Sequence, residues 1–249
     1  GQGGGQPGGL VYLAGWLAEH GGGVVAAWQT VFWLLAGLFV AAGAYHLWAL
    51  PRPVKDLPVP RTQHFWADFL RVFAAFFRQR DIVRILAFLL LYRFAEAQLL
   101  KLVTPFLLDG RDIGGLGLKT QDVGIAYGTV GVTALTLGGL LGGWVISRGG
   151  LKRLLWPLML CMHVPNTVFV ALAVWQPTHL AVISAGIALE QFGYGFGFTA
   201  YMVFMLMVAG GVDGSAVHKT AHYALCTGFM ALGMMLPGMW AGWLQDQIG

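Results

Sequence analysis

Long apolar stretches separated by short polar turns make up most of the chain. After a half-length stretch near Gly8–Leu17, apolar segments of about 20 residues or more follow one another to the end. A transmembrane helix needs this length, and backbone groups in lipid must form hydrogen bonds within their own segment. The pattern therefore predicts an all-α, polytopic membrane helix bundle. We expect complete spans at Val24–Leu50, Ile82–Leu108, Val123–Ile146, Leu154–Trp175, Leu180–Ala209 and Ala221–Leu244.

A polar segment that contains four prolines between positions 51 and 60 interrupts this pattern. Proline cannot continue a helix, so the segment reads as a linker. Behind it, phenylalanines recur at helical spacing opposite Asp68, Arg71 and Arg78, which is typical of a helix lying in the membrane surface. We expect three parts: residues 1–50 with a half span and one complete span, a cytoplasmic linker with this interfacial helix at 51–81, and a bundle of five spans at 82–249.

The composition excludes several classes of protein. Hydrophobic residues make up 57% of the chain and charged residues 10%, and the mean hydropathy is +0.68, which does not fit a soluble protein. The two cysteines lie in apolar runs, so neither a disulfide framework nor a cysteine-based zinc site is expected. His218 and His222 are four residues apart, but Lys219 stands where a zinc protease needs a glutamate base. We expect no metal, no cofactor and no enzymatic activity.

The basic residues indicate how the spans are oriented. Most of the 15 lysines and arginines lie in the linker and in the turns at Ser147–Arg153 and Gly210–Lys219. Helices joined by short loops leave such residues in the cytoplasm, so these three segments are predicted to be cytoplasmic. The formal net charge of +4 is therefore not a sign of nucleic-acid binding.

Charged side chains also occur within the spans, where each costs about 2.5 to 3.5 kcal/mol on insertion scales. Arg93 and Glu96 are three residues apart on one helical face, Lys101 follows, and Glu190 lies in the middle of a glycine-rich span. Such residues usually face a bundle interior or a water-filled cavity. Two interpretations stay open: Arg93 and Glu96 neutralise each other while Glu190 forms a hydrogen bond across helices, or the three form a functional site. Asn166 is a weaker candidate beside Pro165, because a proline-kinked span commonly lines a cavity.

The turn at residues 143–153 resembles the cytoplasmic loop signature of the major facilitator superfamily. A glycine, an arginine, a second glycine and two further basic residues recur at the spacing of that signature, and Ser147 stands in place of its usual acid. The resemblance implies a gating loop between neighbouring helices. Its residues here are Gly143, Arg148, Gly150, Lys152 and Arg153.

Other segments resemble AmpG-type muropeptide permeases of the same superfamily, in the same order along the chain. Residues 91–97 look like the seventh helix, Glu190 with Gly193–Gly197 like the tenth, and residues 237–244 like the end of the eleventh. Gly8–Pro53 is similar to the end of the fifth helix, the sixth helix and the start of the central loop. The resemblance implies a partial major-facilitator fold, from the end of helix 5 through helix 11. We therefore expect a piece of a longer protein, whose partners are the remainder of its own bundle or other membrane subunits.

The resemblance implies a proton-coupled secondary transporter in the bacterial inner membrane, which moves an anionic sugar- or peptide-containing solute by alternating access. Arg93 or Lys101 would hold a substrate carboxylate, with arginine the better bidentate partner. Glu96 or Glu190 would carry the proton. Asn166, Gln191 and Tyr194 would form hydrogen bonds with sugar hydroxyls. The expected partners are thus membrane lipid, the solute and protons. The alternative is a permease-derived structural subunit of a larger membrane complex that transports nothing.

Overall fold

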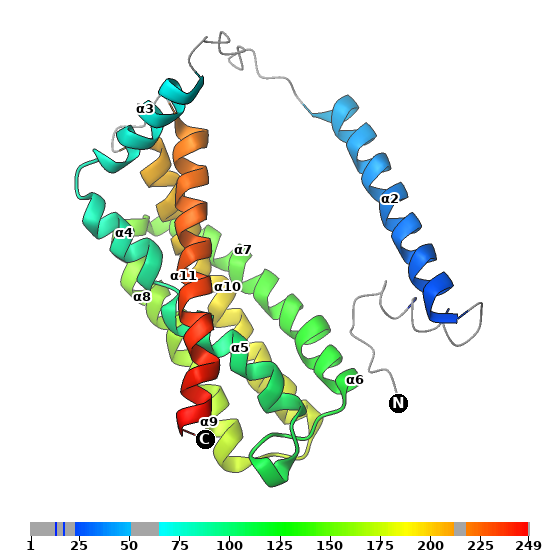
Figure 1. Cartoon of the computed structure of the whole chain (residues 1–249). Coiled ribbons are helices and arrows are strands. Elements are labelled where there is room, and N and C mark those ends of the chain that lie inside the picture. Colours follow the sequence, from blue (N-terminus) through cyan, green and yellow to red (C-terminus); the bar gives the residue numbers. More distant parts are fainter. Residues whose placement is uncertain (1–12, 14–16, 18–22, 51–64, 212–217, 249) are drawn as a thin grey trace. The chain divides into compact units, whose positions relative to one another are not determined.

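The computed structural model describes residues 13, 17, 23–50, 65–211 and 218–248. Secondary structure within these residues is helical, without strands, so the all-α prediction is confirmed (Figure 1). The half span near Gly8–Leu17, apart from two of its residues, and the linker at 51–64 lie outside the described residues. The chain divides into two compact units, residues 1–65 and 66–249.

Helix α2 (Gly23–Ala49) forms most of the described part of the first unit, and it matches the predicted span at Val24–Leu50. Its 27 residues are long and apolar enough to cross a membrane. Large side chains such as Trp33, Phe39 and Trp48 are exposed on it, which suits contact with lipid.

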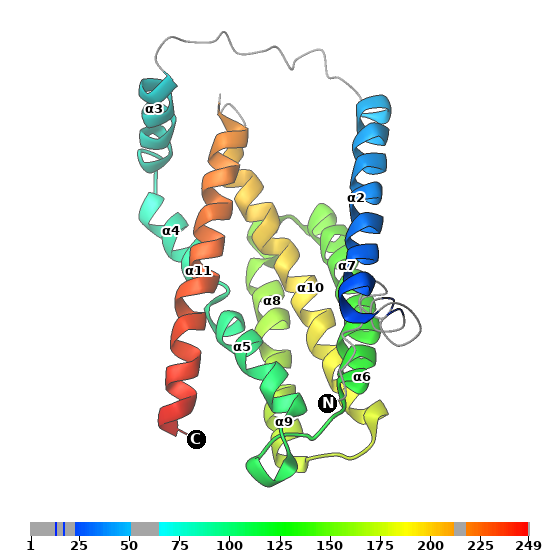
Figure 2. The same cartoon turned by 45° about the vertical axis from the view of Figure 1, so that its right-hand side comes forward.

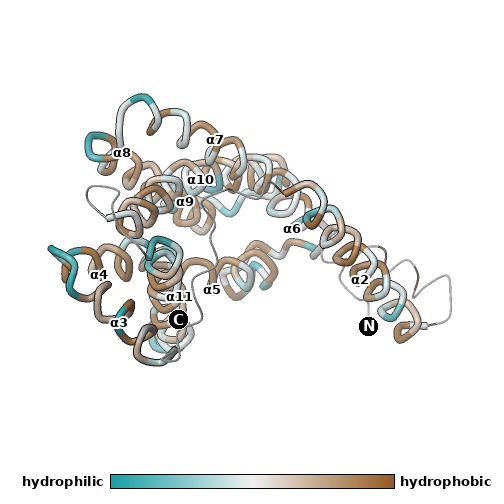
Figure 3. The backbone as a smooth tube through the Cα atoms, turned by 90° about the horizontal axis from the view of Figure 1, so that it is seen from above, coloured by the Kyte–Doolittle hydropathy of each residue, from teal (hydrophilic) through white to brown (hydrophobic). Residues whose placement is uncertain are grey.

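Among its described residues, the second unit contains four further helical segments that could cross a membrane by their length and composition: Gly124–Gly149, Leu151–Trp175, Leu180–Gly210 and Lys219–Leu244. Helix α10 (Leu180–Gly210) lies at the centre, packed on α7, α8 and α11 (Figure 2). Hydrophilic residues gather at turns, for example between α7 and α8 (Figure 3). The elements are α3 (Phe65–Phe77), α4 (Ile82–Leu91), α5 (Phe94–Leu108), η1 (Arg111–Ile113), α6 (Thr120–Val123), η2 (Gly124–Gly131), α7 (Val132–Gly149), α8 (Leu151–His163), η3 (Val164–Asn166), α9 (Thr167–Trp175), α10 and α11 (Lys219–Ile248).

Three of the predicted spans are interrupted. The span predicted as continuous at Ile82–Leu108 is instead two helices, α4 and α5, divided at Tyr92 and Arg93. Arg93 leaves the helical region with φ −106° and ψ 13°. No proline causes this break, and both residues instead make contacts with α10 that apolar periodicity cannot reveal. The break between α8 and α9 does fall at a proline, Pro165, as predicted. The third interruption is η2, a π-helical segment of eight residues that leads into α7.

Helix α3 lies where the amphipathic helix is predicted after the linker. Phe76 is fully buried and packs on α11, with ring centroids 5.6 Å from His222 and 6.1 Å from Phe229. Leu70 and Phe73 are exposed. One face of α3 therefore belongs to the bundle, and its position in the membrane surface stays a prediction.

Glycines bring the backbones of α7, α8 and α10 into direct contact. A Cβ atom added at Gly138 of α7 would overlap the backbone oxygen of Phe192, and one at Gly195 of α10 would overlap that of Leu135. On the other side of α10, a Cβ at Gly197 would lie 2.5 Å from the backbone oxygen of Leu158 in α8. Small residues permit this spacing in membranes, where close packing rather than hydrophobic burial drives helix association. Glycine is thus required at these positions by the approach of a neighbouring helix.

Two tyrosines tie α4 and its break to α10. The Tyr92 hydroxyl donates to the backbone oxygen of Gly197 at 2.9 Å, and the Tyr201 hydroxyl donates to that of Leu89 at 2.7 Å. Both side chains are buried. In one hydrogen bond the donor lies at the end of α4 and the acceptor in α10, and in the other the donor lies in α10 and the acceptor in α4. Together they fix the position of the two segments relative to each other.

We expect Tyr201→Phe to lower the free energy of unfolding by about 1 kcal/mol, because it removes one buried hydrogen bond and keeps the ring. Equilibrium unfolding of the purified protein in mixed micelles would measure this. The control is Tyr45→Phe in α2, where the side chain is exposed and should leave stability unchanged. Equal stabilities for both variants would contradict the role given to the Tyr201 hydroxyl.

Candidate functional site

Three charged side chains are buried where α5 begins and in the first half of α10. The exposed fraction is 8% for Arg93, 0% for Glu96 and 1% for Glu190. Arg93 lies at the break before α5, and Glu96 lies in the first turn of that helix. All three therefore face the interior of the bundle rather than the surrounding lipid.

Two aromatic rings of α10 hold the Arg93 guanidinium. It donates to the Tyr194 hydroxyl, and its central carbon lies 4.7 Å from the ring centroid of Phe198 and 5.4 Å from that of Tyr194. Cation–π contacts of this kind strengthen when water is excluded. The Nε atom of Arg93 is buried and has no hydrogen-bond partner. The cation is thus stabilised by aromatic faces while a donor is left free.

Glu96 has no hydrogen-bond partner for either carboxyl oxygen, although it is fully buried. No ion pair within 4.0 Å joins it to Arg93 in the described part of the chain. Its carboxyl interacts electrostatically with both Arg93 and Glu190. An ionised carboxylate that is buried without a donor is costly by several kcal/mol, so this environment favours a carboxyl that holds a proton. The described residues therefore show no direct contact by which Arg93 and Glu96 could neutralise each other.

Glu190 is held in a different way. Its Oε2 accepts a hydrogen bond of 2.9 Å from the Nε2 of Gln191. Tyr127 of η2 lies near both Glu190 and Gln191. Glu190 thus has a hydrogen-bond donor at its carboxyl and Glu96 has none, so the two glutamates occupy unlike environments within one cluster.

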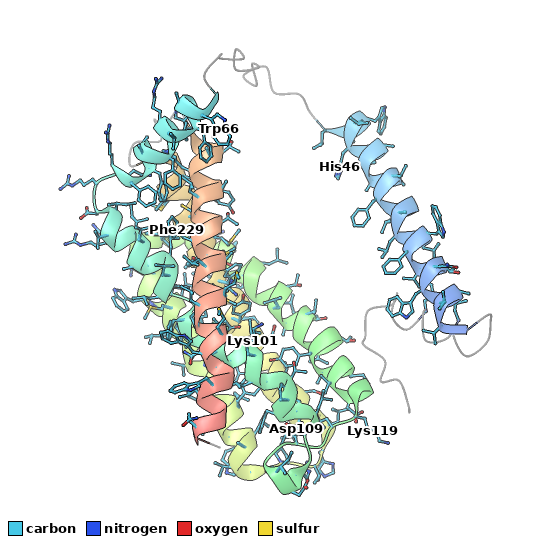
Figure 4. All side chains as sticks on the ribbon, in the orientation of Figure 1. His46, Trp66, Lys101, Asp109, Lys119 and Phe229 are labelled. Atoms are coloured by element: carbon cyan, nitrogen blue, oxygen red, sulfur yellow. The ribbon has the colours of Figure 1, made fainter. Side chains whose placement is uncertain are left out.

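Lys101 is not part of this cluster. It is exposed on α5 and lies beside α11, where its side chain approaches Gly238 (Figure 4). A cavity of about 410 Å³ opens there between the two helices. Its lining is apolar apart from the lysine and consists of Ala97, Leu100, Lys101, Met234, Met235, Gly238 and Met239.

Asn166 lies in η3, at the break between α8 and α9, and its Oδ1 is buried without a hydrogen-bond partner. The neighbouring Pro165 packs close to Gly193 of α10. This contact brings η3 against the residue that precedes Tyr194. Asn166 therefore lies in the segment that packs beside Gly193 of α10.

The gating loop expected from the sequence forms the end of α7 and the start of α8. Gly150 has φ +73°, a conformation that favours glycine, and it separates the two helices. Arg148 stacks on Trp144 with its central carbon 4.7 Å from the ring centroid, and Ser147 donates to the Trp144 backbone oxygen at 2.7 Å. The other expected residues are Gly143, half-buried in α7, and Lys152 and Arg153, both exposed in α8.

Sequence reasoning missed Phe198 and Tyr127. Phe198 is four residues after Tyr194 and so lies on the same face of α10. This spacing would have identified Phe198 from the sequence as a neighbour of Tyr194. Tyr127 had no such signal, because its position depends on the π-helical geometry of η2.

Together these features define a multi-pass helical membrane protein with an ionisable cluster buried at a helix break. No protein-family profile matches the chain. Curated relatives do: the anhydromuropeptide permease of Escherichia coli K12 is 27% identical over 237 residues, which are 95% of this chain and 45% of the relative. An uncharacterized Haemophilus influenzae protein is 27% identical over an alignment of 255 positions, which covers 98% of this chain and 55% of the relative.

A Rickettsia prowazekii protein whose name includes AmpG is 23% identical over 192 residues, or 74% of this chain and 40% of its own length. The chain is thus similar to AmpG-type transporters over nearly all its residues, and the resemblance inferred from the sequence is confirmed. It spans about half the length of the curated relatives that it matches.

Proposed function

We propose that the chain belongs to a proton-coupled secondary transporter that moves an anionic, muropeptide-like solute across the bacterial inner membrane by alternating access. The observation that carries the proposal is the buried cluster of Arg93, Glu96 and Glu190 at a helix break. Ionisable residues at bilayer depth commonly mark substrate and proton pathways. The similarity to an anhydromuropeptide permease supports this class of solute.

Arg93 is the proposed site for a substrate carboxylate. Its fork of N–H donors can bind a carboxylate in bidentate fashion, and its Nε is free. Gln191 and Asn166 supply amide groups for the sugar and peptide parts, whereas the Tyr194 hydroxyl accepts a hydrogen bond from Arg93 itself. Lys101 lies eight residues further along α5, about 12 Å at 1.5 Å per residue, and would bind a second anionic group.

Glu96 and Glu190 are the proposed proton carriers. Both are buried in a protein interior where a carboxyl can exchange a proton only when the path to water opens. Alternating access provides that opening. The gating loop from Gly143 to Arg153 would control it at the cytoplasmic face, to which residues 51–81 are also assigned.

In this transporter, residues 1–50 would be the end of the N-terminal bundle, residues 51–81 the cytoplasmic linker with its interfacial helix, and residues 82–249 the C-terminal bundle. The structural subunit considered as an alternative is not favoured, because the relatives with functional names are called permease or transporter.

Vesicle uptake tests the coupling. The full product of the gene is reconstituted, and accumulation of a labelled anhydromuropeptide is measured with and without a pH gradient. We expect Glu96→Gln or Glu190→Gln to abolish gradient-driven accumulation while exchange of labelled for unlabelled solute persists, since glutamine keeps the shape and cannot release a proton. Asp109→Asn, at the exposed end of α5, is the matched control. Accumulation that stays gradient-driven in both glutamate variants would remove these residues from the proton step.

A further inference from the structure

We propose that Glu96 and the substrate anion compete for Arg93, and that Tyr194 and Phe198 hold Arg93 ready for the substrate while Glu96 carries a proton. This inference rests on the proposed function and specifies an order: the proton binds first and the anion second. Tyr194 is then a positioning residue, which acts on the substrate through Arg93.

The position of Arg93 supports the first step. Arg93 is the residue that precedes α5 and Glu96 lies in the first turn of that helix, so their side chains start close together and the Arg93 guanidinium can reach the Glu96 carboxyl. It contacts Tyr194 and Phe198 instead. Glu96 therefore keeps two carboxyl oxygens without a partner, and Arg93 keeps an unpaired Nε donor. These groups could form an ion pair, but they do not do so in this structure.

The charge state of Glu96 determines which arrangement is favoured. A neutral carboxyl attracts the guanidinium weakly, so the aromatic rings keep Arg93 and its free donor remains available. An ionised carboxylate three residues away attracts the guanidinium strongly in a buried site of low dielectric constant. Loss of the proton would thus draw Arg93 to Glu96 and release a bound anion.

The groups that face Glu96 are consistent with this exchange. They include Glu190 and Tyr194 from α10, Tyr127 from η2 and Arg93 from the break before α5. Gly233 and Gly238 of α11 lie against Leu90 and Lys101, and residues 233–238 of that helix include no titratable side chain. Glu190 already accepts a hydrogen bond from Gln191 and is the less suitable competitor. Arg93 is accordingly the cation for which an ionised Glu96 would compete with the substrate.

Calorimetry of the purified full gene product with an anhydromuropeptide, from about pH 5 to about pH 8, tests the competition. For the unaltered protein we expect the affinity to fall by up to about tenfold per pH unit at the alkaline end, as one linked proton requires. Glu96→Gln should bind tightly at every pH, whereas the exposed control Asp109→Asn should keep the slope. A slope that persists in Glu96→Gln overturns the inference.

Tyr194→Phe separates positioning from direct contact with the substrate. If Tyr194 holds Arg93 away from an ionised Glu96, then its loss should weaken binding about tenfold or more in the unaltered protein and have little effect in the Glu96→Gln background. An equal loss in both backgrounds would mean that Tyr194 acts independently of Glu96, and it would contradict the inference.

A measurement without substrate distinguishes this inference from the proposed function. Infrared difference spectra detect the carbonyl stretch of a protonated carboxyl, and the part missing in Glu96→Gln belongs to Glu96. We expect this band to disappear at lower pH in Tyr194→Phe than in the unaltered protein. Failure of any anhydromuropeptide to bind would reject the proposed substrate, whereas an unshifted band would reject the competition for Arg93.

Discussion

Replacing Arg93 by glutamine is expected to lower anhydromuropeptide uptake at low substrate concentration by about 10- to 100-fold. A hydrogen bond to a charged group contributes about 1.5–3 kcal/mol, and each 1.4 kcal/mol corresponds to a factor of ten in affinity. Glutamine also leaves Glu96 without its neighbouring cation. The loss should appear chiefly as a higher KM, measured by initial uptake rates in vesicles.

Two further variants show whether charge or geometry matters at this position. Arg93→Lys keeps the charge but loses the planar fork and much of the stacking on Phe198, so we expect it to recover only part of the uptake. Arg84→Gln makes the same change in charge at an arginine whose side chain is 85% exposed, and it should transport normally. Full uptake by Arg93→Gln would exclude Arg93 as the anion site.

Substituting leucine for Gly138 should prevent normal packing of α7 on α10. Even the first carbon of the new side chain would overlap the Phe192 backbone oxygen, which cannot move without shifting the whole of α10. Overpacking costs about 1–3 kcal/mol where neighbours can adjust, and more where a backbone is in the way. We expect at least that loss in the free energy of unfolding, together with poor recovery of folded protein in detergent.

The adjacent glycine provides the control for this prediction. A Cβ at Gly139 would have its nearest neighbour, the Gly195 backbone oxygen, at 3.8 Å, an ordinary contact. Gly139→Ala should therefore retain the stability of the unaltered protein, whereas Gly138→Ala should lower it. Similar unfolding curves for these two alanine variants would show that the close approach of α7 and α10 does not depend on glycine.

The sequence was sufficient to predict the spans but not their interruptions. Apolar length identified every described span to within a few residues, because lipid imposes one requirement on each of them. The proline at 165 also marked the break between α8 and α9 correctly. The break at Tyr92 and Arg93 has no local signal, since it accompanies hydrogen bonds to residues about a hundred positions away on α10.

The candidate site shows the same division between local and distant information. Charge at bilayer depth was enough to select Arg93, Glu96 and Glu190, because such residues are too costly to face lipid. The partner of Arg93 could not be predicted, since the helical spacing favoured Glu96 and the structure has Tyr194 and Phe198 instead. Lys101, which follows on the same helix, turned out to lie beside α11 in a separate cavity.

A change in the helical geometry of η2 would alter the direction of Tyr127 relative to Glu190. A π turn contains one residue more than an α turn, so tightening this segment to α geometry moves the surplus residue past the end of the helix. Residues on one side of the adjustment then rotate by about 100° relative to those on the other. Tyr127 would then point in a different direction relative to Glu190, while the helical hydrogen bonds of α7 would be kept.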